Sequence, residues 1–542
     1  MNIIYLILIT VLGLGLRVIG LNKTQGLWND EYVSWMIASK PLGADFVHGI
    51  LSQCHMPFYY LYLKFFMHFG GNGDLFLRAT SVLAGVLSII VMYFVGLQHS
   101  KKTALICALF TSISSFLIYY SQEVRIYSLL FLISALTLLY LLRFLKNKTW
   151  TTLGGLVLFN FLIIFTHTIG FVFVFFELVA LTILLFNEYK KQLLTIWGGI
   201  IVLDGICLPQ IIHIFTAKSF SQWWGTFSIS KIGFLFTDYF SPVLTNLVNA
   251  PDNFLYVKSL SFVFFTIVPT LIALVFIARA LYKNKKNIAL FSICVGFVLI
   301  MTVAAILGKL VFITKYSIEI YPILLFLAAY GACSFENKKI ANTFIACFCA
   351  ISLTYLFISP TSAPKIPRPQ GHKLVADLLN RAKPNQNDII ILEYYSKDRY
   401  EKYFDFSKFQ IISIDKANFP EYFMSDKDVA EIFTNGKPLL KDIFAEKKSS
   451  YLDYVMRDSV LSKVQKGQNV IVIIPDSVAF YSKDDIKAIT NDRYRYEHTP
   501  FLYLIFSYVR NRVFDDLQQG LAVTRYEKLG DWSLIQFTKL NK

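Results

Sequence analysis

The stretch that decides the fold is residues 151–187, which read TTLGGLVLFNFLIIFTHTIGFVFVFFELVALTILLFN. An apolar run of about 17–25 residues is long enough to cross a hydrocarbon core of roughly 30 Å. This stretch is too long for one crossing, so we divide it at Thr166-His167-Thr168. The sequence here predicts two membrane-spanning helices joined by a tight turn.

The rest of the chain has the same character. Its 542 residues are 55% hydrophobic and 16% aromatic, with a mean hydropathy of +0.52. This composition excludes an ordinary soluble globular protein. We predict a membrane all-α bundle of about eleven transmembrane helices at residues 3–21, 79–97, 103–121, 126–145, 151–167, 169–187, 193–215, 259–281, 288–307, 316–333 and 341–358.

Alternate connections between these segments are short and basic. Such loops stay in the cytoplasm, and all five fall on one side if the N-terminus is cytoplasmic too. The first segment has no basic leader and no small-residue cleavage site, so we interpret it as a retained anchor. The odd number of spans then places the chain from about residue 359 onward, and the loops 22–78 and 216–258, on the outer face. The basic loops are 98–102, 143–148, 189–191, 279–286 and 337–339.

Two domains are expected, a transmembrane domain at 1–358 and a soluble extracytoplasmic α/β domain at 359–542. A proline-rich joint at 359–369 separates them. Short apolar runs alternate with helical patterns after it, which is typical of a small α/β fold. Its expected elements are helices at 371–382, 427–433 and 477–491, strands at 388–392, 410–414 and 469–474, and a hairpin at 526–538 around Gly530-Asp531.

Charge and cysteine content argue against a nucleic-acid-binding protein and against a zinc-stabilised one. The net charge of +16 lies largely in the cytoplasmic loops, and no basic-aromatic array indicates nucleic-acid binding. The seven cysteines form no CxxC pair, which argues against a structural zinc site. Cys54 is the one cysteine that falls in an outer loop.

Two adjacent acids follow the first predicted span, in Leu27-Trp28-Asn29-Asp30-Glu31. Charge beside a low-dielectric bilayer is costly unless it has a partner or a function. Asp30 is a candidate general base, and Glu31 is a candidate ligand for a metal or a sugar hydroxyl. The alternative is a helix start, because acids favour the first turn of a helix.

Other polar residues are expected on the same outer face. His55 precedes an aromatic stretch that runs to Phe69 and suits a helix lying along the interface, or a plain aromatic belt. Arg125 could hold a phosphate with its guanidinium group, or form a salt bridge with Glu123 in the same turn. Ionisable clusters at a membrane edge indicate a functional site. The full candidate set is Asp30, Glu31, His55, Arg78, Glu123, Arg125, Tyr127, His167, Lys315 and Tyr316.

The order of these motifs resembles a known family. Trp28-Asn29-Asp30-Glu31, His55-Met56-Pro57-Phe58-Tyr59-Tyr60, Ser121-Gln122-Glu123-Val124-Arg125-Ile126-Tyr127 and Thr166-His167 follow one another as in the GT-C-fold glycosyltransferases. The resemblance is to the family-39-like protein O-mannosyltransferases and aminoarabinose-lipid A transferases, over about residues 1–400. Lys315-Tyr316 stands where such proteins often have Arg-Tyr, which keeps the charge but loses the bidentate fork.

The resemblance implies a membrane glycosyltransferase of the bacterial inner membrane that acts in cell-envelope glycosylation. Its donor would be a sugar on a polyprenyl phosphate that enters from the bilayer, and its acceptor a lipid, glycan or protein. Asp30 would act as the base with support from Glu31, and one displacement would invert the anomeric carbon. Arg125 and Lys315 would neutralise the leaving phosphate. Some relatives use a divalent cation, which Asp30 and Glu31 could hold, and two juxtamembrane helices are implied near 31–40 and 56–69.

Two other classes of protein fit parts of the sequence. A secondary transporter or flippase for an envelope precursor could use Glu177 and Asp204, which lie inside predicted spans, as a proton relay. A non-catalytic assembly or sensor protein could use the tail as its binding module. Dependence on an ion gradient would favour the transporter, whereas sugar transfer from a polyprenyl phosphate would favour the enzyme.

Overall fold

The computed structural model divides the chain into two compact units. One unit comprises residues 1–23 and 30–368, and the other comprises residues 24–29 and 369–542. The first is helical and the second contains the β-sheet. The described residues are 2–22, 26–51, 56–210, 212, 229–244, 260–307, 312–360, 362–365, 373–393, 400–414, 464–465, 468–475, 517–518, 521–529 and 532–539.

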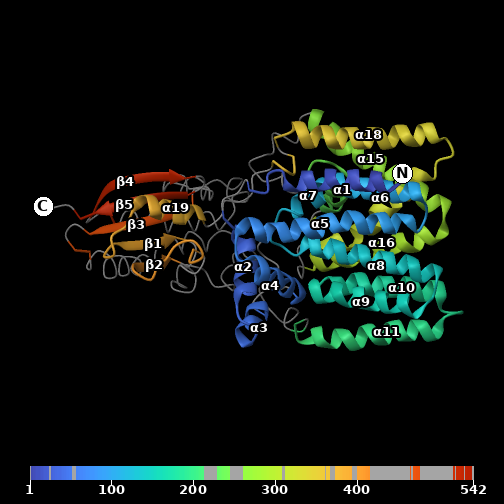
Figure 1. Cartoon of the computed structure of the whole chain (residues 1–542), viewed down its shortest axis with the longest axis horizontal. Coiled ribbons are helices and arrows are strands. Elements are labelled where there is room, and N and C mark those ends of the chain that lie inside the picture. The colour runs from blue at the N-terminus through green and yellow to red at the C-terminus, as the bar shows by residue number, and fades with distance from the viewer. Residues whose placement is uncertain are drawn as a thin grey trace. The chain divides into compact units, whose positions relative to one another are not determined.

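The helical unit is built from long apolar helices that run side by side (Figure 1). Over the described residues, every one of the predicted spans falls on one helix or on consecutive helices. They are α1 (Asn2–Val18), α5 (Asp74–Leu97), α6 (Lys101–Ile113), α7 (Ser115–Tyr120), α8 (Tyr127–Lys146), α9 (Trp150–Thr166), α10 (Gly170–Leu185), α11 (Lys190–Asp204), α15 (Leu260–Lys283), α16 (Lys285–Ile306), α17 (Tyr321–Cys333) and α18 (Lys338–Ile358).

Seven helices among the described residues are long and apolar enough to cross a membrane. They are α5, α8, α11 with its continuation to Gln210, α15, α16, α17 with the turn before it, and α18. Three further apolar helices, α1, α9 and α10, are shorter. The predicted multi-pass helical membrane protein is thereby confirmed, and the count of eleven spans stays a prediction.

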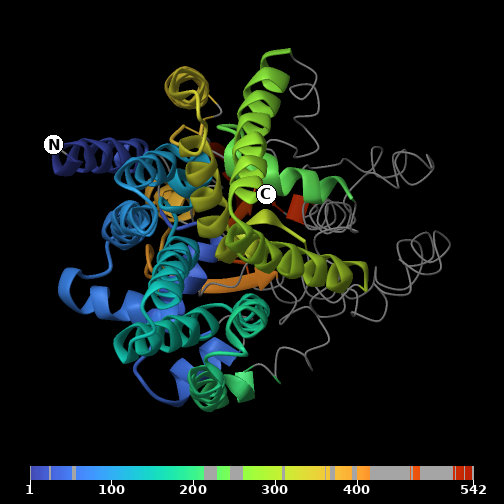
Figure 2. The same ribbon diagram turned by 90° about the vertical axis from the view of Figure 1, so that its right-hand side faces the viewer.

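Outward-facing side chains of the bundle are apolar, as a lipid solvent requires. On α1, Ile4, Leu8 and Val11 are each about three-fifths exposed. Figure 2 shows this helix, which begins at the label N, at the edge of the bundle. An apolar surface of this kind is rare on a soluble monomer, so the exposed faces of the bundle are the surfaces that meet lipid.

The segment 103–121 is not the single helix that the sequence predicts. It breaks at Ser114, whose backbone is extended (φ −63°, ψ 114°), into α6 and α7. A break leaves the last carbonyl groups of a helix without helical partners. The fully buried Arg17 on α1 supplies donors, to the carbonyl oxygens of Thr111 and Ser112 at 3.1 Å each.

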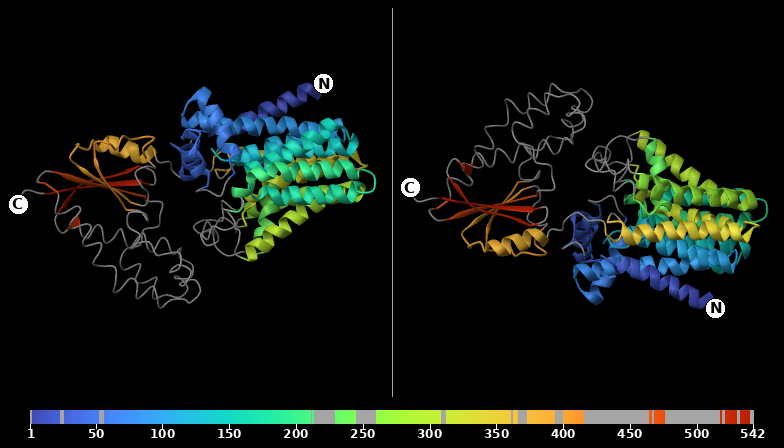
Figure 3. Two further views of the ribbon diagram at one scale, coloured as in Figure 1. Left: turned by 90° about the horizontal axis from the view of Figure 1, so that it is seen from below. Right: turned by 90° about the horizontal axis from the view of Figure 1, so that it is seen from above.

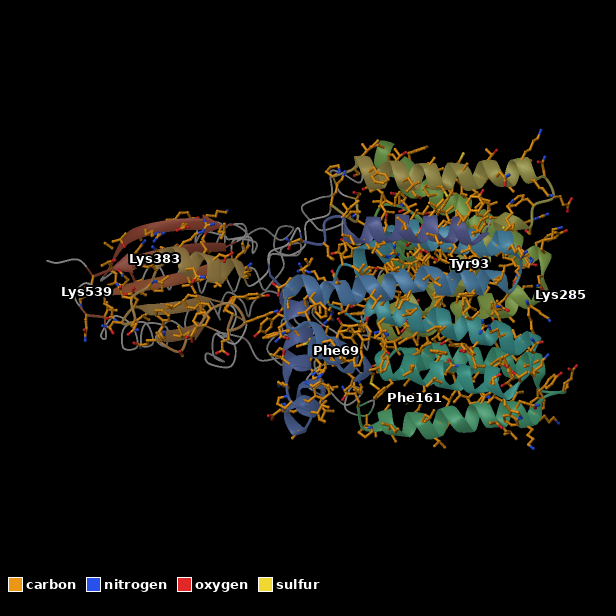
Figure 4. All side chains as sticks on the ribbon, in the orientation of Figure 1. Phe69, Tyr93, Phe161, Lys285, Lys383 and Lys539 are labelled. Carbon is orange, nitrogen blue, oxygen red and sulfur yellow. The ribbon has the colours of Figure 1, made fainter. Side chains whose placement is uncertain are left out.

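Lysines of the basic loops contact residues of neighbouring loops and helix ends at one end of the bundle. Lys102 donates to Asn342 Oδ1 at 3.0 Å, and Lys283 pairs with Glu336 at 3.0 Å. Lys146 donates to the carbonyl oxygen of Gln98, and Lys148 lies over the ring of Tyr189. Figure 4 shows Lys285 at this end and Phe69 at the opposite end. The basic loops thus share one side, as the positive-inside pattern predicts.

Short helices gather at the opposite end of the bundle (Figures 1 and 3). Two lie near the helices predicted in the first long loop, and a third between them was not predicted. A short 3-10 helix leads into α17. These elements are α2 (Asn29–Ser39), α3 (Ala44–Leu51), α4 (Phe58–Gly70), α13 (Ser230–Phe240) and η4 (Thr314–Ile320), with η1 (Gly205–Cys207) after α11.

The second unit holds a five-stranded sheet of order β2-β1-β3-β5-β4. β1 is parallel to both of its neighbours, β2 and β3, whereas β5 is antiparallel to both of its neighbours, β3 and β4. Helix α19 (Lys373–Ala382) crosses one face (Figure 3), and its Leu374 and Leu378 join Ile390, Leu392 and Ile471 in the core. The strands are β1 (Ile389–Glu393), β2 (Gln410–Ile414), β3 (Asn469–Pro475), β4 (Ala522–Leu529) and β5 (Trp532–Thr538).

These strands agree with the predicted ones, and β4 and β5 form the predicted closing hairpin. The predicted helices 427–433 and 477–491 and the turn Gly530-Asp531 lie outside the described residues.

Candidate active site

Glu31 is locked in a buried ion pair. Its side chain is fully buried, and Arg78 donates to both carboxylate oxygens, from Nε at 2.9 Å and from Nη2 at 2.6 Å. The backbone N–H of Val124 donates to the same carboxylate at 3.0 Å. Glu31 therefore joins α2, α5 and the turn before α8. From the sequence, Glu31 and Arg78 are separate candidates for the site, but in the structure they are partners of each other.

Asp30 has a different environment from its neighbour. Its side chain is 31% exposed, and its Oδ2 lies 3.7 Å from Nη2 of Arg125. Arg125 is nearly buried and also donates from Nη1 to the backbone carbonyl of Asp30 at 3.2 Å. Both acids stand in the first turn of α2, as the helix-start alternative expects. Of the two carboxylates, that of Asp30 is the accessible one.

The charge on Arg125 is secured by its neighbours. Burial by itself lowers the pKa of a guanidinium group, but Asp30, Tyr127 and Tyr60 raise it by more. The net effect places the pKa of Arg125 above its ordinary value. Arg125 is therefore a permanent cation beside Asp30.

The turn that carries Arg125 is tied to α1. Gln122 donates from Nε2 to the carbonyl oxygens of Arg17 at 2.9 Å and Ile19 at 2.7 Å. Glu123 is 3% exposed, and its carbonyl oxygen accepts the N–H of Arg125 at 2.8 Å. These bonds fix the turn at the end of the bundle where α2 begins.

Lys315 and Tyr316 approach this cluster from η4. The Lys315 ammonium lies 5.4 Å from the ring centroids of both Tyr127 and Tyr316, which is within range of a cation–π interaction. The structure thus brings Asp30, Arg125, Tyr127, Lys315 and Tyr316 together, from three separate stretches of sequence.

His167 has a buried partner that the sequence analysis missed. Its Nδ1 lies 2.6 Å from Oε1 of Glu319. Because a carboxylate has no proton to donate, the bond requires the tautomer in which the Nδ1–H of His167 donates. The ring centroids of His167 and Tyr316 are 6.1 Å apart. Glu319 stands four residues after Lys315 at the start of a predicted span. An ionisable residue in that position was the signal that could have identified it.

A second missed set of residues supports η4. Thr314 Oγ1 donates to Asp238 Oδ2 at 2.8 Å, and the Tyr239 hydroxyl donates to the carbonyl oxygen of Ser317 at 2.6 Å. The Tyr321 hydroxyl in turn donates to the carbonyl oxygen of Tyr239. Asp238 and Tyr239 lie in the long loop 216–258, where the sequence analysis found no candidate.

One predicted residue cannot be placed, and a metal site is not evident. His55 lies outside the described residues. Among the described residues, no three His, Cys, Asp or Glu side chains are grouped to hold a metal ion. Both oxygens of Glu31 accept from Arg78, and Asp30 faces Arg125. This donor set does not fit the divalent cation that some members of the resembled family use and that Asp30 and Glu31 could hold.

A sequence comparison matches part of the chain to one family. Residues 54–213 match the family described as dolichyl-phosphate-mannose-protein mannosyltransferase. That range includes five of the described candidates, Arg78, Glu123, Arg125, Tyr127 and His167. No curated protein sequence matches the chain.

Solved structures match the whole chain in fold. ArnT from Cupriavidus metallidurans in the apo state superposes with a TM-score of 0.54 at 10% identity, covering 98% of this chain and 97% of ArnT. The same ArnT bound to undecaprenyl phosphate gives a TM-score of 0.50 at 10% identity, with the same coverage. The arabinofuranosyltransferase AftD from Mycobacteria gives 0.52 at 12% identity, covering 99% of this chain and 40% of AftD.

At such low identity these structures establish the fold. Together with the matched family they confirm the resemblance that the order of the motifs predicts. The chain has the GT-C fold and resembles the membrane glycosyltransferases of the protein mannosyltransferase and ArnT type.

Proposed function

We propose that the protein is an integral-membrane glycosyltransferase. It moves a sugar from a polyprenyl-phosphate-linked donor to an acceptor hydroxyl or phosphate on the outer face of the membrane, with inversion at the anomeric carbon. The observation that carries the proposal is the contrast between two adjacent acids: Asp30 is accessible beside a fixed cation, whereas Glu31 is buried in an ion pair.

Asp30 is the proposed general base. A base must reach the proton that it removes, and the partly exposed carboxylate of Asp30 meets that condition. Glu31 supports it indirectly, because the Glu31–Arg78 ion pair fixes the first turn of α2 to α5. We therefore assign Glu31 and Arg78 to positioning rather than to substrate contact.

Arg125 and Lys315 are the proposed partners of the lipid phosphate. As the acceptor oxygen attacks the anomeric carbon, the sugar–phosphate bond breaks and negative charge grows on the leaving phosphate. Cations that are already in place stabilise that charge without a rearrangement. A single displacement of this kind inverts the anomeric carbon. The ArnT structure with undecaprenyl phosphate supports a lipid of this class as the carrier.

The topology follows from the two ends of the bundle. The basic end would face the cytoplasm and the Asp30 end the periplasm or exterior, since basic loops remain inside. With eleven spans in a bacterial inner membrane, the domain at 359–542 lies outside the cytoplasm. The acceptor, a lipid, glycan or protein, is therefore an envelope component.

The test is a transfer assay with the full chain in liposomes. Undecaprenyl phosphate carrying radiolabelled mannose or aminoarabinose is the donor, and a membrane extract supplies acceptors. We expect label to move to the extract, and Asp30→Asn to reduce the rate at least about 100-fold, in the range of lost acid–base catalysis. Asp45→Asn, an exposed acid at the start of α3, is the matched control and should leave the rate unchanged.

Two outcomes would contradict the proposal. Full activity of Asp30→Asn would remove Asp30 as the base. Movement of intact donor that requires a proton or sodium gradient, with no transfer of label, would instead indicate a transporter.

A further inference from the structure

Glu319 is a buried acid that the proposed reaction does not use. Its side chain is fully buried and its Oε1 lies 2.6 Å from Nδ1 of His167. Within the part of the chain that the structure describes, Oε2 of Glu319 has no hydrogen-bond partner. An ionisable group removed from water is costly unless it is paired. The contact with His167 is therefore the interaction that offsets the burial of Glu319.

Glu319 shares a short helix with Lys315, a proposed partner of the phosphate, and with Tyr316 of the same cluster. η4 carries Lys315, Tyr316 and Glu319 within five residues. His167 meets this helix twice, through its hydrogen bond to Glu319 and through its ring, 6.1 Å from that of Tyr316. His167, at the end of α9, therefore contacts η4 next to Lys315 and Tyr316.

η4 needs such support because its own backbone is weak. A 3-10 helix has poorer hydrogen-bond geometry than an α-helix, and Ser317 interrupts this one with non-helical angles (φ −122°, ψ 20°). Side chains from outside compensate: Tyr239 binds the carbonyl oxygen of Ser317 and Asp238 binds Thr314. Glu319 adds a further side-chain hydrogen bond, to His167.

We infer that Glu319 is a positioning residue for the lipid phosphate. By accepting the Nδ1–H of His167, it fixes η4 so that Lys315 and Tyr316 meet the phosphate of a polyprenyl phosphate in a set geometry. The inference rests on the proposed function, which supplies the phosphate. Donors that are held in place bind a developing charge far better than mobile ones. Glu319 itself does not contact the phosphate, because two negative groups would repel each other.

Binding measurements on the purified full chain test this role. The probes are undecaprenyl phosphate and undecaprenol, and the ratio of their affinities is the phosphate preference. Glu319→Ala should lower the phosphate preference about tenfold, the size expected for one lost buried hydrogen bond. Glu319→Gln keeps an oxygen that can accept the Nδ1–H and should stay within about threefold of the natural protein.

A matched control separates positioning from general destabilisation. Glu177 is an equally buried acid on α10, outside the proposed site. Glu177→Ala should leave the phosphate preference unchanged, even if it lowers the unfolding temperature. Because Glu319→Ala leaves His167 unpaired, the double variant His167→Ala/Glu319→Ala serves as a second test. It should lose the phosphate preference to the same extent as the single variant.

Three results would overturn the inference. They are an unchanged phosphate preference in Glu319→Ala, an unchanged preference in the double variant, and a loss in Glu319→Gln as large as in Glu319→Ala. Failure of the proposed function gives a different result, since the natural protein would then show neither phosphate preference nor sugar transfer.

Discussion

Arg78 binds both carboxylate oxygens of Glu31 across 47 positions of sequence, and neither side chain is more than 2% exposed. A bidentate pair of this kind fixes direction as well as distance. The contact orients the first turn of α2, and with it the adjacent Asp30. In the reaction proposed above, the two neighbouring acids then have separate tasks, one structural and one chemical.

This division predicts that two conservative changes differ strongly in their effect on stability. Glu31→Gln leaves a buried guanidinium group without its counter-ion and should destabilise the protein by about 3 kcal/mol. Asp30→Asn should change stability by less than about 0.5 kcal/mol, because its carboxylate is partly exposed and its contact with Arg125 is long. Unfolding of the purified protein in detergent measures both. Equal loss of stability in the two variants would contradict the division.

Arg125 should determine the rate of the proposed sugar transfer without contributing to the pH dependence of that rate. Its pKa is raised, so its charge is present at every pH below that raised value and is constant from pH 5 to pH 10. Arg125→Gln should lower kcat/KM for the lipid donor by about 100-fold. Arg125→Lys should be less impaired and should keep the natural pH–rate profile up to about pH 9, because a lysine is charged there. A profile altered below pH 9 in Arg125→Lys would count against this assignment.

Tyr59 predicts how stability changes at alkaline pH. Burial raises the pKa of this phenol well above 10, an effect that Arg125 partly opposes. The unfolded chain loses the Tyr59 proton near pH 10 and the folded chain does not. The contribution of Tyr59 to stability is therefore complete below pH 10 and is lost as the pH rises further.

The matching experiment compares Tyr59→Phe with the natural protein between pH 7 and pH 11.5. At pH 7 the two should be within about 0.5 kcal/mol, because the Tyr59 hydroxyl has no hydrogen-bond partner among the described residues. Above pH 10 the variant should lose less stability than the natural protein. Tyr282→Phe, which changes an exposed phenol, should show no such difference. Parallel curves for Tyr59→Phe and the natural protein would refute the assignment.

Gly331 predicts where the bundle tolerates no added volume. A Cβ at this position of α17 would lie 1.7 Å from the carbonyl oxygen of Phe276 on α15. Small residues allow membrane helices to approach this closely. Gly331→Ala should therefore cost about 3 kcal/mol or abolish folding.

Gly154 on α9 is the matched control for Gly331. A Cβ there meets no atom within 4 Å, so Gly154→Ala should be neutral or stabilise slightly. Thermal unfolding in detergent distinguishes the two variants. Similar midpoints for both would show that α15 and α17 separate easily.

Much of the fold could be predicted because the apolar composition of a single segment is enough to indicate a membrane helix. The stretch 151–187 divides at His167 as expected, since α9 ends at Thr166 and α10 begins at Gly170. The strand Asn469–Ile474 was predicted from a short run of branched apolar residues. Each of these signals lies within one segment of chain.

Contacts between distant segments were less accessible to prediction. The break at Ser114 was missed because α6 and α7 are both apolar, and the donors that stabilise the break come from Arg17 on another helix. Glu319 was missed because its partner lies 152 residues away. Asp30 and Arg125 can be identified as candidates from the sequence, but the exposure that separates Asp30 from Glu31 is a property of packing.

Arg17 also bears on how the protein is assembled. A carbonyl group freed by the break between α6 and α7 cannot face lipid, because the bilayer core offers no donor. Because α1 precedes α6 in the chain, Arg17 is synthesised before Thr111 and Ser112, whose carbonyl oxygens accept from it. The order of synthesis thus supplies these donors before the carbonyl groups that they bind.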